Sequence, residues 1–289
     1  MYKRQPITSF IGVYKIKKNF RNIKIVLESH GDFINTLELE KNLIFPAVYR
    51  KLFLKMASYT INKADILRAV SSSTEEQALS FDPSKRVVRF PAWVDFEIFS
   101  KVQASRSDEK DFKILFIGSV TDRKKPHLIV EAINKIKNKD IKLYVVGPTP
   151  NENYLSQLKE LVHNYDLEDQ VLFTGSVDRK AVMDHYADTN LMILPSVSEG
   201  LARVIFESQA TACPVLVTDA PGMGDIVIDG QTGYIFESDN LESLTNKIQE
   251  IINNYNDAVH VGNNAKDFIL SNYSADNFKF SFKKLFDTV

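Results

Sequence analysis

From residue 112 onward, short runs of consecutive apolar residues alternate with stretches in which apolar residues recur every three or four positions. The runs predict buried strands at 112–117, 141–146, 171–174, 191–194, 215–218 and 234–236. The stretches between them predict helices at 126–137, 152–165, 179–187, 202–211 and 241–253. Continuous apolar strands that alternate with helices are typical of a parallel sheet covered on both faces. The pattern therefore predicts a doubly wound α/β domain, in which ligands bind at the carboxyl ends of the strands.

The first 105 residues repeat this α/β pattern with fewer elements. They predict strands at 23–27, 66–70 and 87–90 and a helix at 48–60. Residues 101–110 are polar and charged, which is typical of a linker. We therefore predict a first, partial domain over 1–105, a second domain over 106–270, and a final phenylalanine-rich helix over 271–289.

Composition narrows the class of protein. Of the 289 residues, 44% are apolar and 25% are charged, which is the profile of a soluble globular chain with a sizeable core. The single cysteine, Cys213, excludes a disulfide framework and fits a reducing, cytoplasmic setting. Charge is unevenly divided, because residues 1–110 hold 19 basic and 12 acidic side chains, whereas 111–289 hold 17 and 25. This division predicts two units with different partners.

The most informative segment is 195–217, which follows a predicted strand. Glu199 and Glu207 are separated by seven residues, so the second glutamate lies about two helical turns beyond the first. Residues 200–202 open the predicted helix, where free N–H groups and the helix dipole attract an anion. A carboxylate beside such an anion site, with a second carboxylate for a diol, suits a nucleotide-linked sugar. The alternative is a capping glutamate followed by a surface glutamate.

This segment resembles the Glu-x7-Glu signature of the retaining glycosyltransferases with the GT-B fold (family four in the usual numbering). Further landmarks occur in the same order as in that family. They are residues 64–71, 90–99, 118–132, 186–196, 214–215 and 229–234. The resemblance covers most of residues 24–289. It implies two Rossmann-like domains, with the final helix crossing back to the first, incomplete one.

The resemblance also implies a role for each matching residue. Glu199 would orient the hydroxyls of the transferred sugar and support its oxocarbenium-like transition state. Glu207 would accept hydrogen bonds from the nucleotide ribose, and His30 would face the reacting sugar as a second catalytic residue. Lys124, helped by Arg123, would neutralise the leaving diphosphate. The other donor-binding positions implied are Gly118, Ser119, Val177, Gly200, Leu201 and Ala202.

The implied reaction is transfer of a hexose-type sugar from a UDP- or GDP-sugar to a glycan or lipid-linked acceptor. The family implies retention at the anomeric carbon, no metal, and a front-face mechanism in which the leaving phosphate helps to deprotonate the acceptor hydroxyl. No cofactor is expected besides the nucleotide-sugar donor, which is a substrate, and no nucleic acid partner is expected. The expected setting is cytoplasmic synthesis of a bacterial surface polysaccharide.

Two of the departures from the family pattern bear on donor binding. Ser119 stands where many relatives have an arginine, so Arg123 is the candidate that compensates. Relatives also begin with a strand, a glycine-rich loop that contacts the donor and two or three further βα units. We therefore expect an N-terminally truncated reading frame. A nucleotide-sugar-binding fragment without turnover is the alternative function, while the glutamate spacing argues against an epimerase on the same fold.

Two further segments have open interpretations. Residues 41–56 mix apolar and basic side chains. That mixture suits either peripheral contact with an anionic membrane face or an ordinary core-facing helix. Residues 222–227 partly mimic a dinucleotide-binding fingerprint, whereas the family resemblance implies a sugar-facing loop there.

Overall fold

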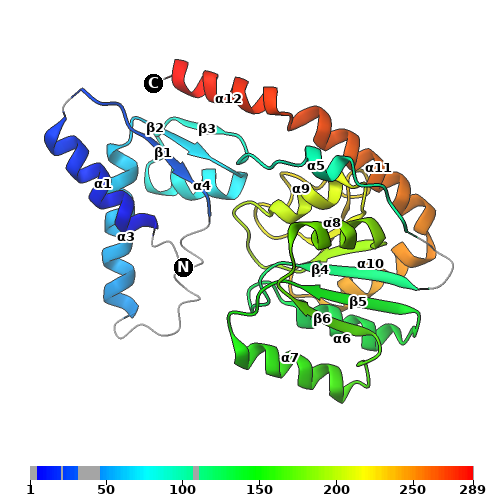
Figure 1. Cartoon of the computed structure of the whole chain (residues 1–289). Coiled ribbons are helices and arrows are strands. Elements are labelled where there is room, and N and C mark those ends of the chain that lie inside the picture. The colour runs from blue at the N-terminus through cyan, green and yellow to red at the C-terminus, as the bar shows by residue number, and fades with distance from the viewer. Residues whose placement is uncertain (1–4, 21, 32–45, 107–110, 289) are drawn as a thin grey trace. The chain divides into compact units, whose positions relative to one another are not determined.

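The protein is described by a computed structural model that covers residues 5–20, 22–31, 46–106 and 111–288 (Figure 1). It divides into two compact units. The first unit comprises residues 1–93 together with 275–289, and the second unit comprises residues 94–274. Both are built on parallel strands with helices between them, which confirms the predicted α/β class. The domain boundaries given above at 105 and 270 stay a prediction.

The second unit contains a six-stranded parallel sheet in the order β6-β5-β4-β7-β8-β9. The strands are β4 (Phe112–Ile117), β5 (Ile141–Val146), β6 (Val171–Gly175), β7 (Leu191–Leu194), β8 (Val215–Thr218) and β9 (Tyr234–Phe236). Every strand agrees with its predicted range to within one residue. The agreement has a physical cause, because β7 and β8 are buried along their whole length and therefore read as uninterrupted apolar runs.

The strand order reverses between β4 and β7. From β4 the sheet continues through β5 and β6 in one direction, and from β7 it continues through β8 and β9 in the other. The two central strands pair in parallel through Ile114 with Leu191 and Leu115 with Met192. Ligands of doubly wound proteins bind at the carboxyl edge of the sheet beside such a reversal. The loops that follow β4 and β7 are therefore the place to look for a site.

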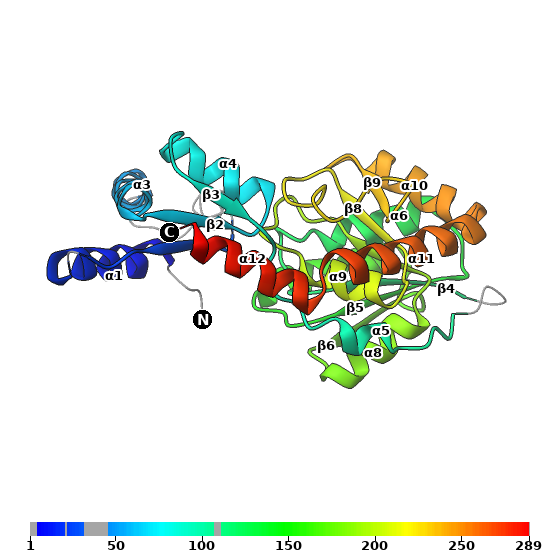
Figure 2. The same ribbon diagram turned by 90° about the horizontal axis from the view of Figure 1, so that it is seen from above.

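Helices cover both faces of this sheet, with α6 and α10 on one face and α8, α9 and α11 on the other (Figure 2), and α7 packs against α6. The helices described in the second unit are α5 (Glu97–Ser100), α6 (Pro126–Ile136), α7 (Glu152–Asn164), α8 (Arg179–Asp188), α9 (Arg203–Ala210), α10 (Leu241–Asn253) and α11 (Tyr255–Asn272). Helix α11 was not predicted. Its buried side includes Ala258, Gly262 and Ala265, and such small residues give little hydrophobic periodicity.

The first unit contains a three-stranded parallel sheet in the order β1-β2-β3. Its elements are α1 (Gln5–Asn19), β1 (Val26–Ser29), α3 (Pro46–Lys63), β2 (Ile66–Ala69), α4 (Ser72–Phe81), β3 (Val87–Arg89) and α12 (Ala275–Asp287). Successive residues of β2 face opposite sides. Ile66 packs with Phe90 and with Leu285 of α12, whereas Leu67 packs with Ile61 of α3. Helix α12 therefore belongs to the core of this unit.

The amphipathic segment 41–56 overlaps the start of α3, while residues 41–45 lie outside the described residues. Phe53, Ala57 and Ile61 of this helix are buried, whereas Val48 and Leu52 are exposed. Helix α3 thus has a core-facing side, and contact with a membrane stays a prediction. Over the described ranges, no helix combines the length and the hydropathy that crossing a bilayer would require.

Candidate functional site

Two loops at the reversal of the sheet carry the candidate site of the second unit. The loop after β4 contains Arg123 and Lys124, and the loop after β7 contains Glu199. The backbone joins the two loops, because the Val197 N–H donates to the Arg123 carbonyl oxygen at 3.2 Å. The geometry of the sheet therefore brings together residues that are far apart in sequence.

The Glu199 carboxylate is the centre of this arrangement. Its Oε1 atom lies 3.0 Å from Lys124 Nζ and 3.2 Å from a guanidinium nitrogen of Arg123. Ser196 Oγ donates a hydrogen bond to the same oxygen at 3.0 Å. Burial by itself would raise the pKa of Glu199, but the charges of Lys124 and Arg123 outweigh it and hold that pKa below its ordinary value. The carboxylate is therefore an anion at neutral pH.

The surroundings hold Glu199 in place. The Ser196 carbonyl oxygen accepts a hydrogen bond from Thr218 Oγ1 at 2.6 Å, and the Ser198 carbonyl oxygen accepts one from Arg123. The Glu199 backbone is also packed against Gly222, where a Cβ atom would lie 2.5 Å from the Glu199 carbonyl oxygen. Gly222 has a φ of +91°, which glycine adopts without strain.

The phosphate loop predicted from sequence begins directly after β4. Gly118 has a φ of +144°, and a Cβ atom there would lie 3.1 Å from Lys124 Nζ. A glycine at this position therefore leaves room for the lysine side chain. Ser119 follows in the same loop and is half-buried, and Val177, after β6, packs in part against the core.

Residues 200–202 were predicted to open the helix that follows β7, but the structure places them before it. Helix α9 begins at Arg203, with Ala202 as the residue that precedes its first turn, so the three residues lie before the helix and do not open it. The reason is local, because Ala202 has φ −81° and ψ 84°, outside the helical region. Within the described part of the chain, the backbone N–H groups of Gly200, Leu201 and Ala202 donate no hydrogen bond. They can therefore still serve an anionic ligand.

Glu207 lies within α9 and belongs to a neighbouring cluster. The Tyr186 hydroxyl donates to Glu207 Oε2 at 3.3 Å and to the Val204 carbonyl oxygen at 3.2 Å. Burial raises the pKa of Glu207, against the opposing charge of Arg203. Tyr186 was part of a sequence landmark, but its contact with Glu207 could not be predicted, since nothing in the intervening sequence shows that α8 and α9 meet.

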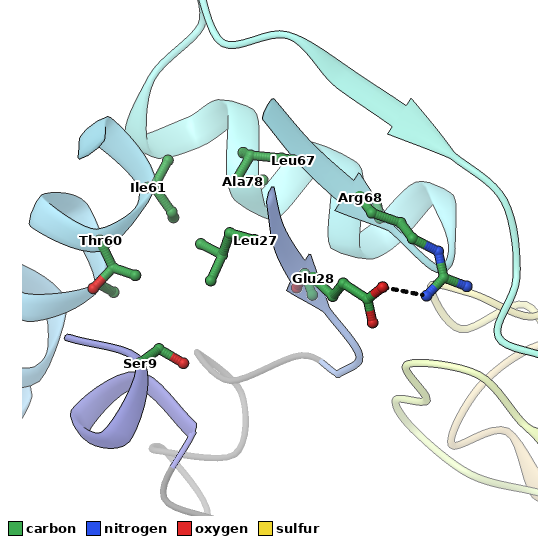
Figure 3. Close-up of a pocket in the computed structure, with 11 residues that line it drawn as sticks. Ser9, Leu27, Glu28, Thr60, Ile61, Leu67, Arg68 and Ala78 are labelled. Atoms are coloured by element: carbon green, nitrogen blue, oxygen red, sulfur yellow. Dashed lines mark ion pairs between the residues drawn. The ribbon is translucent and has the colours of Figure 1, made fainter. Parts of the chain in front are cut away.

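The remaining predicted catalytic residue, His30, lies in the first unit just after β1. Its Nε2 atom is 2.7 Å from Glu28 Oε2, and Glu28 Oε1 is 3.1 Å from Arg68 on β2. Figure 3 shows Glu28 and Arg68 at the edge of a pocket whose walls include Leu27, Ile61 and Leu67. Sequence reasoning missed Glu28 as a partner of His30. The signal was available in the spacing of two residues, because alternate residues at the end of a strand point to the same side.

Across the described ranges, no group of three or more His, Cys, Asp or Glu side chains could hold a metal ion. Positive charge at the site is supplied by Lys124 and Arg123. The structure thus joins Gly118, Arg123, Lys124 and Glu199 in one set of contacts.

The family model described as Glycosyl transferases group 1 matches residues 97–268, which is more than half of the chain. The chain is 25% identical over 199 residues to the capsular polysaccharide biosynthesis glycosyltransferase CapM of Staphylococcus aureus, covering 63% of this chain and 49% of CapM. It is 24% identical over 262 residues to the N-acetyl-alpha-D-glucosaminyl L-malate synthase of Bacillus anthracis, covering 88% of this chain and 65% of the synthase.

A solved structure shows the same fold. Anabaena HepE in complex with UDP has a TM-score of 0.82 at 15% identity, and the match covers 99% of this chain and 77% of HepE. The chain spans about half to two thirds of the length of the two curated relatives.

Proposed function

This chain belongs to the glycosyl transferases group 1 family, and from that premise we propose that it carries the donor site of a retaining, metal-independent hexosyltransferase. The donor is a UDP- or GDP-sugar, and the acceptor is a glycan or a lipid-linked glycan in surface polysaccharide synthesis. The observation that carries the proposal is the convergence of Lys124, Arg123 and Glu199 at the sheet reversal. The UDP complex of HepE and the capsular role in the name of CapM support the donor class and the pathway.

The donor diphosphate binds to the loop after β4 in this proposal. Lys124 and Arg123 supply positive charge where the bond to the sugar breaks and negative charge grows on the departing phosphate. The N–H groups of Gly200, Leu201 and Ala202 donate to no other described residue, and in this proposal they donate hydrogen bonds to the diphosphate. Glu207 accepts hydrogen bonds from the ribose hydroxyls from within α9, and Val177 contacts the base.

The chemical step follows from this placement. Glu199 orients the sugar hydroxyls and stabilises positive charge as the bond from the anomeric carbon to the diphosphate oxygen breaks. The acceptor hydroxyl oxygen forms its bond to the anomeric carbon on the same face, and its proton passes to the departing phosphate. The configuration is therefore retained without a covalent enzyme intermediate. His30, whose Nε2 atom lies 2.7 Å from Glu28 Oε2, is the second catalytic residue in this proposal.

The setting that we propose is the cytoplasmic face of the membrane. The basic excess of residues 1–110 and the exposed apolar residues Val48 and Leu52 of α3 support peripheral contact with anionic lipid. A lipid-linked acceptor would be reached from that position.

A thermal-shift panel of UDP, GDP, their sugar conjugates and inorganic pyrophosphate tests the donor site. We expect one nucleotide series to raise the melting temperature of the natural sequence. Lys124→Ala should reduce the shift for every diphosphate, because it removes a cation from the phosphate loop. Glu207→Ala should reduce the shift for nucleotides but leave that for pyrophosphate, which has no ribose.

The matched control is Lys159→Ala on the exposed side of α7, which should change none of the shifts. Unchanged shifts in both site variants would overturn the assignment. Donor binding without sugar transfer, measured by NMR of the product anomer, would instead favour the nucleotide-sugar-binding fragment.

A further inference from the structure

The cations that would bind the donor diphosphate already have a carboxylate partner within the protein. Lys124 Nζ and the Arg123 guanidinium lie 3.0 Å and 3.2 Å from the same oxygen of Glu199. A diphosphate needs the same N–H groups, since cationic side chains bind phosphate oxygens at similar distances. Any diphosphate at this loop must therefore share these cations with Glu199 or displace it from them.

Sharing is costly because two anions would then lie close together where little water is present. The side chains of Glu199 and Lys124 are only 10% and 12% exposed, so the repulsion between carboxylate and phosphate is weakly screened. Glu199 also has little freedom to turn away. Ser196 holds its carboxylate, and Gly222 packs against its backbone.

We propose that Glu199 is a specificity-determining residue that weakens the binding of bare nucleoside diphosphates and thereby favours sugar-bearing donors. A sugar offers hydroxyl groups that donate hydrogen bonds to the carboxylate and compensate for its lost cation contacts. A bare diphosphate offers the carboxylate no such donors. The inference rests on the proposed function, because it takes Lys124 and Arg123 as ligands of the diphosphate.

The fixed charge of Glu199 would also affect release of the product after sugar transfer. Once the sugar has left, the product diphosphate again faces an uncompensated carboxylate, so Glu199 promotes its release. The same side chain would thus orient the sugar before transfer and weaken the hold on the product afterwards. Both effects come from a negative charge that is fixed in position.

Isothermal titration calorimetry with the Glu199→Gln variant tests this inference. Glutamine keeps the size of the side chain and removes the charge. We expect UDP or GDP, and inorganic pyrophosphate, to bind roughly tenfold more tightly than to the natural sequence, which corresponds to about 1.4 kcal/mol. The corresponding UDP- or GDP-glucose should gain less, so that the preference for the sugar conjugate falls.

The control is Asp239→Asn, which removes the acidic partner of the adjacent Lys125 and makes the same change in net charge. It should leave pyrophosphate affinity within about twofold of the natural sequence. If Glu199→Gln does not fold, Glu199→Asp withdraws the charge from the cations and should raise affinity in the same direction. The inference is overturned if diphosphates bind the natural sequence and bind the Glu199 variant no more tightly, or if Asp239→Asn gains as much. Absence of diphosphate binding to both proteins would overturn the proposed function itself.

Discussion

Each unit of this protein pairs a glutamate with basic side chains, but the glutamate is half-exposed in the first unit and buried in the second. In the first unit the cation is hidden, because the Arg68 side chain is 2% exposed and that of its partner Glu28 is 35% exposed. In the second unit the anion is buried together with one of its cations, because Glu199 and Lys124 are 10% and 12% exposed while Arg123 is 34% exposed. A ligand can therefore reach Arg123 most readily, and it must displace the Glu199 contact to reach Lys124. Arg68 is an anchor of the fold, whereas Arg123 has an exposed side that is open to a new partner.

The environment of Arg68 shows why it is an anchor. Its guanidinium lies 4.1 Å from the centre of the Phe90 ring and 4.9 Å from that of Phe282 on α12. It also donates to the Pro91 carbonyl oxygen at 2.7 Å. Three kinds of contact thus surround one buried charge, and they join β1, β2 and α12 within the first unit.

Of the substitutions considered, we expect Arg68→Ala to reduce stability the most. We expect a loss of roughly 2–4 kcal/mol in the unfolding free energy of the first unit, because removal of the buried guanidinium also removes its packing, its cation–π contacts and its ion pair with the half-exposed Glu28. Trp93 is the only tryptophan of the chain and lies in this unit, 5.5 Å from the Phe278 ring, so its fluorescence reports this unfolding in denaturant. Lys279→Ala, in an exposed pair with Asp276, should cost less than about 1 kcal/mol. A similar loss in both variants would remove the distinction between anchor and surface pair.

Backbone packing around Glu199 gives the second largest effect. Gly222→Ala forces a Cβ atom to within 2.5 Å of the Glu199 carbonyl oxygen at a φ of +91°. We expect a loss of roughly 1–3 kcal/mol in the unfolding free energy of the second unit, with a shifted Glu199 and altered diphosphate affinity. Gly224→Ala is the matched control, because no atom lies within 4 Å of its added Cβ. Equal stability of the two variants would show that Glu199 is not held by this contact.

The sequence predicted the frame of this site better than its contacts. The strands of the second unit were found to within one residue, because buried parallel strands leave uninterrupted apolar runs. Helices α1, α4 and α11 were missed. For α11 the reason is visible in its buried face, which includes small residues such as Ala258 and Gly262. The described part of the first unit contains three short strands, so fewer buried apolar runs contribute to the pattern there.

The partners of each site residue depend on strand order, which no local pattern encodes. Lys124 and Glu199 are 75 residues apart, and they meet because β7 pairs with β4 although β5 and β6 lie between them in sequence. The family resemblance predicted roles for both residues but not their ion pair. The contact of Glu207 with Tyr186 was likewise visible only in three dimensions, whereas the spacing of Glu28 and His30 could have indicated theirs.

The smallest effect that we expect is on the pH dependence of stability. It distinguishes Glu199 from Glu207, because the pKa values of the two carboxyl groups are shifted in opposite directions. Burial raises the pKa of Glu207 in the folded protein, so its proton is lost from the unfolded chain first as pH rises. Its contribution to stability is therefore present below pH 4.5 and is lost as pH rises through the folded-state pKa. For Glu199 the cations outweigh burial and lower the pKa, so its contribution is present above pH 4.5 and is lost as pH falls through the folded-state pKa.

Melting temperatures at about pH 3, 4.5 and 7 separate the two cases, because these values bracket the ordinary glutamate pKa. Glu207→Gln should reduce the stability lost between pH 4.5 and 7, since glutamine has no proton to lose. Glu199→Gln should reduce the stability lost between pH 4.5 and 3, because the natural carboxylate must gain a proton there and release its cations. Glu160→Gln, on the exposed side of α7, controls for the change in net charge. If both site variants changed the same limb of the pH profile, the two glutamates would share one environment, and the division between a cation-bound Glu199 and a desolvated Glu207 would be wrong.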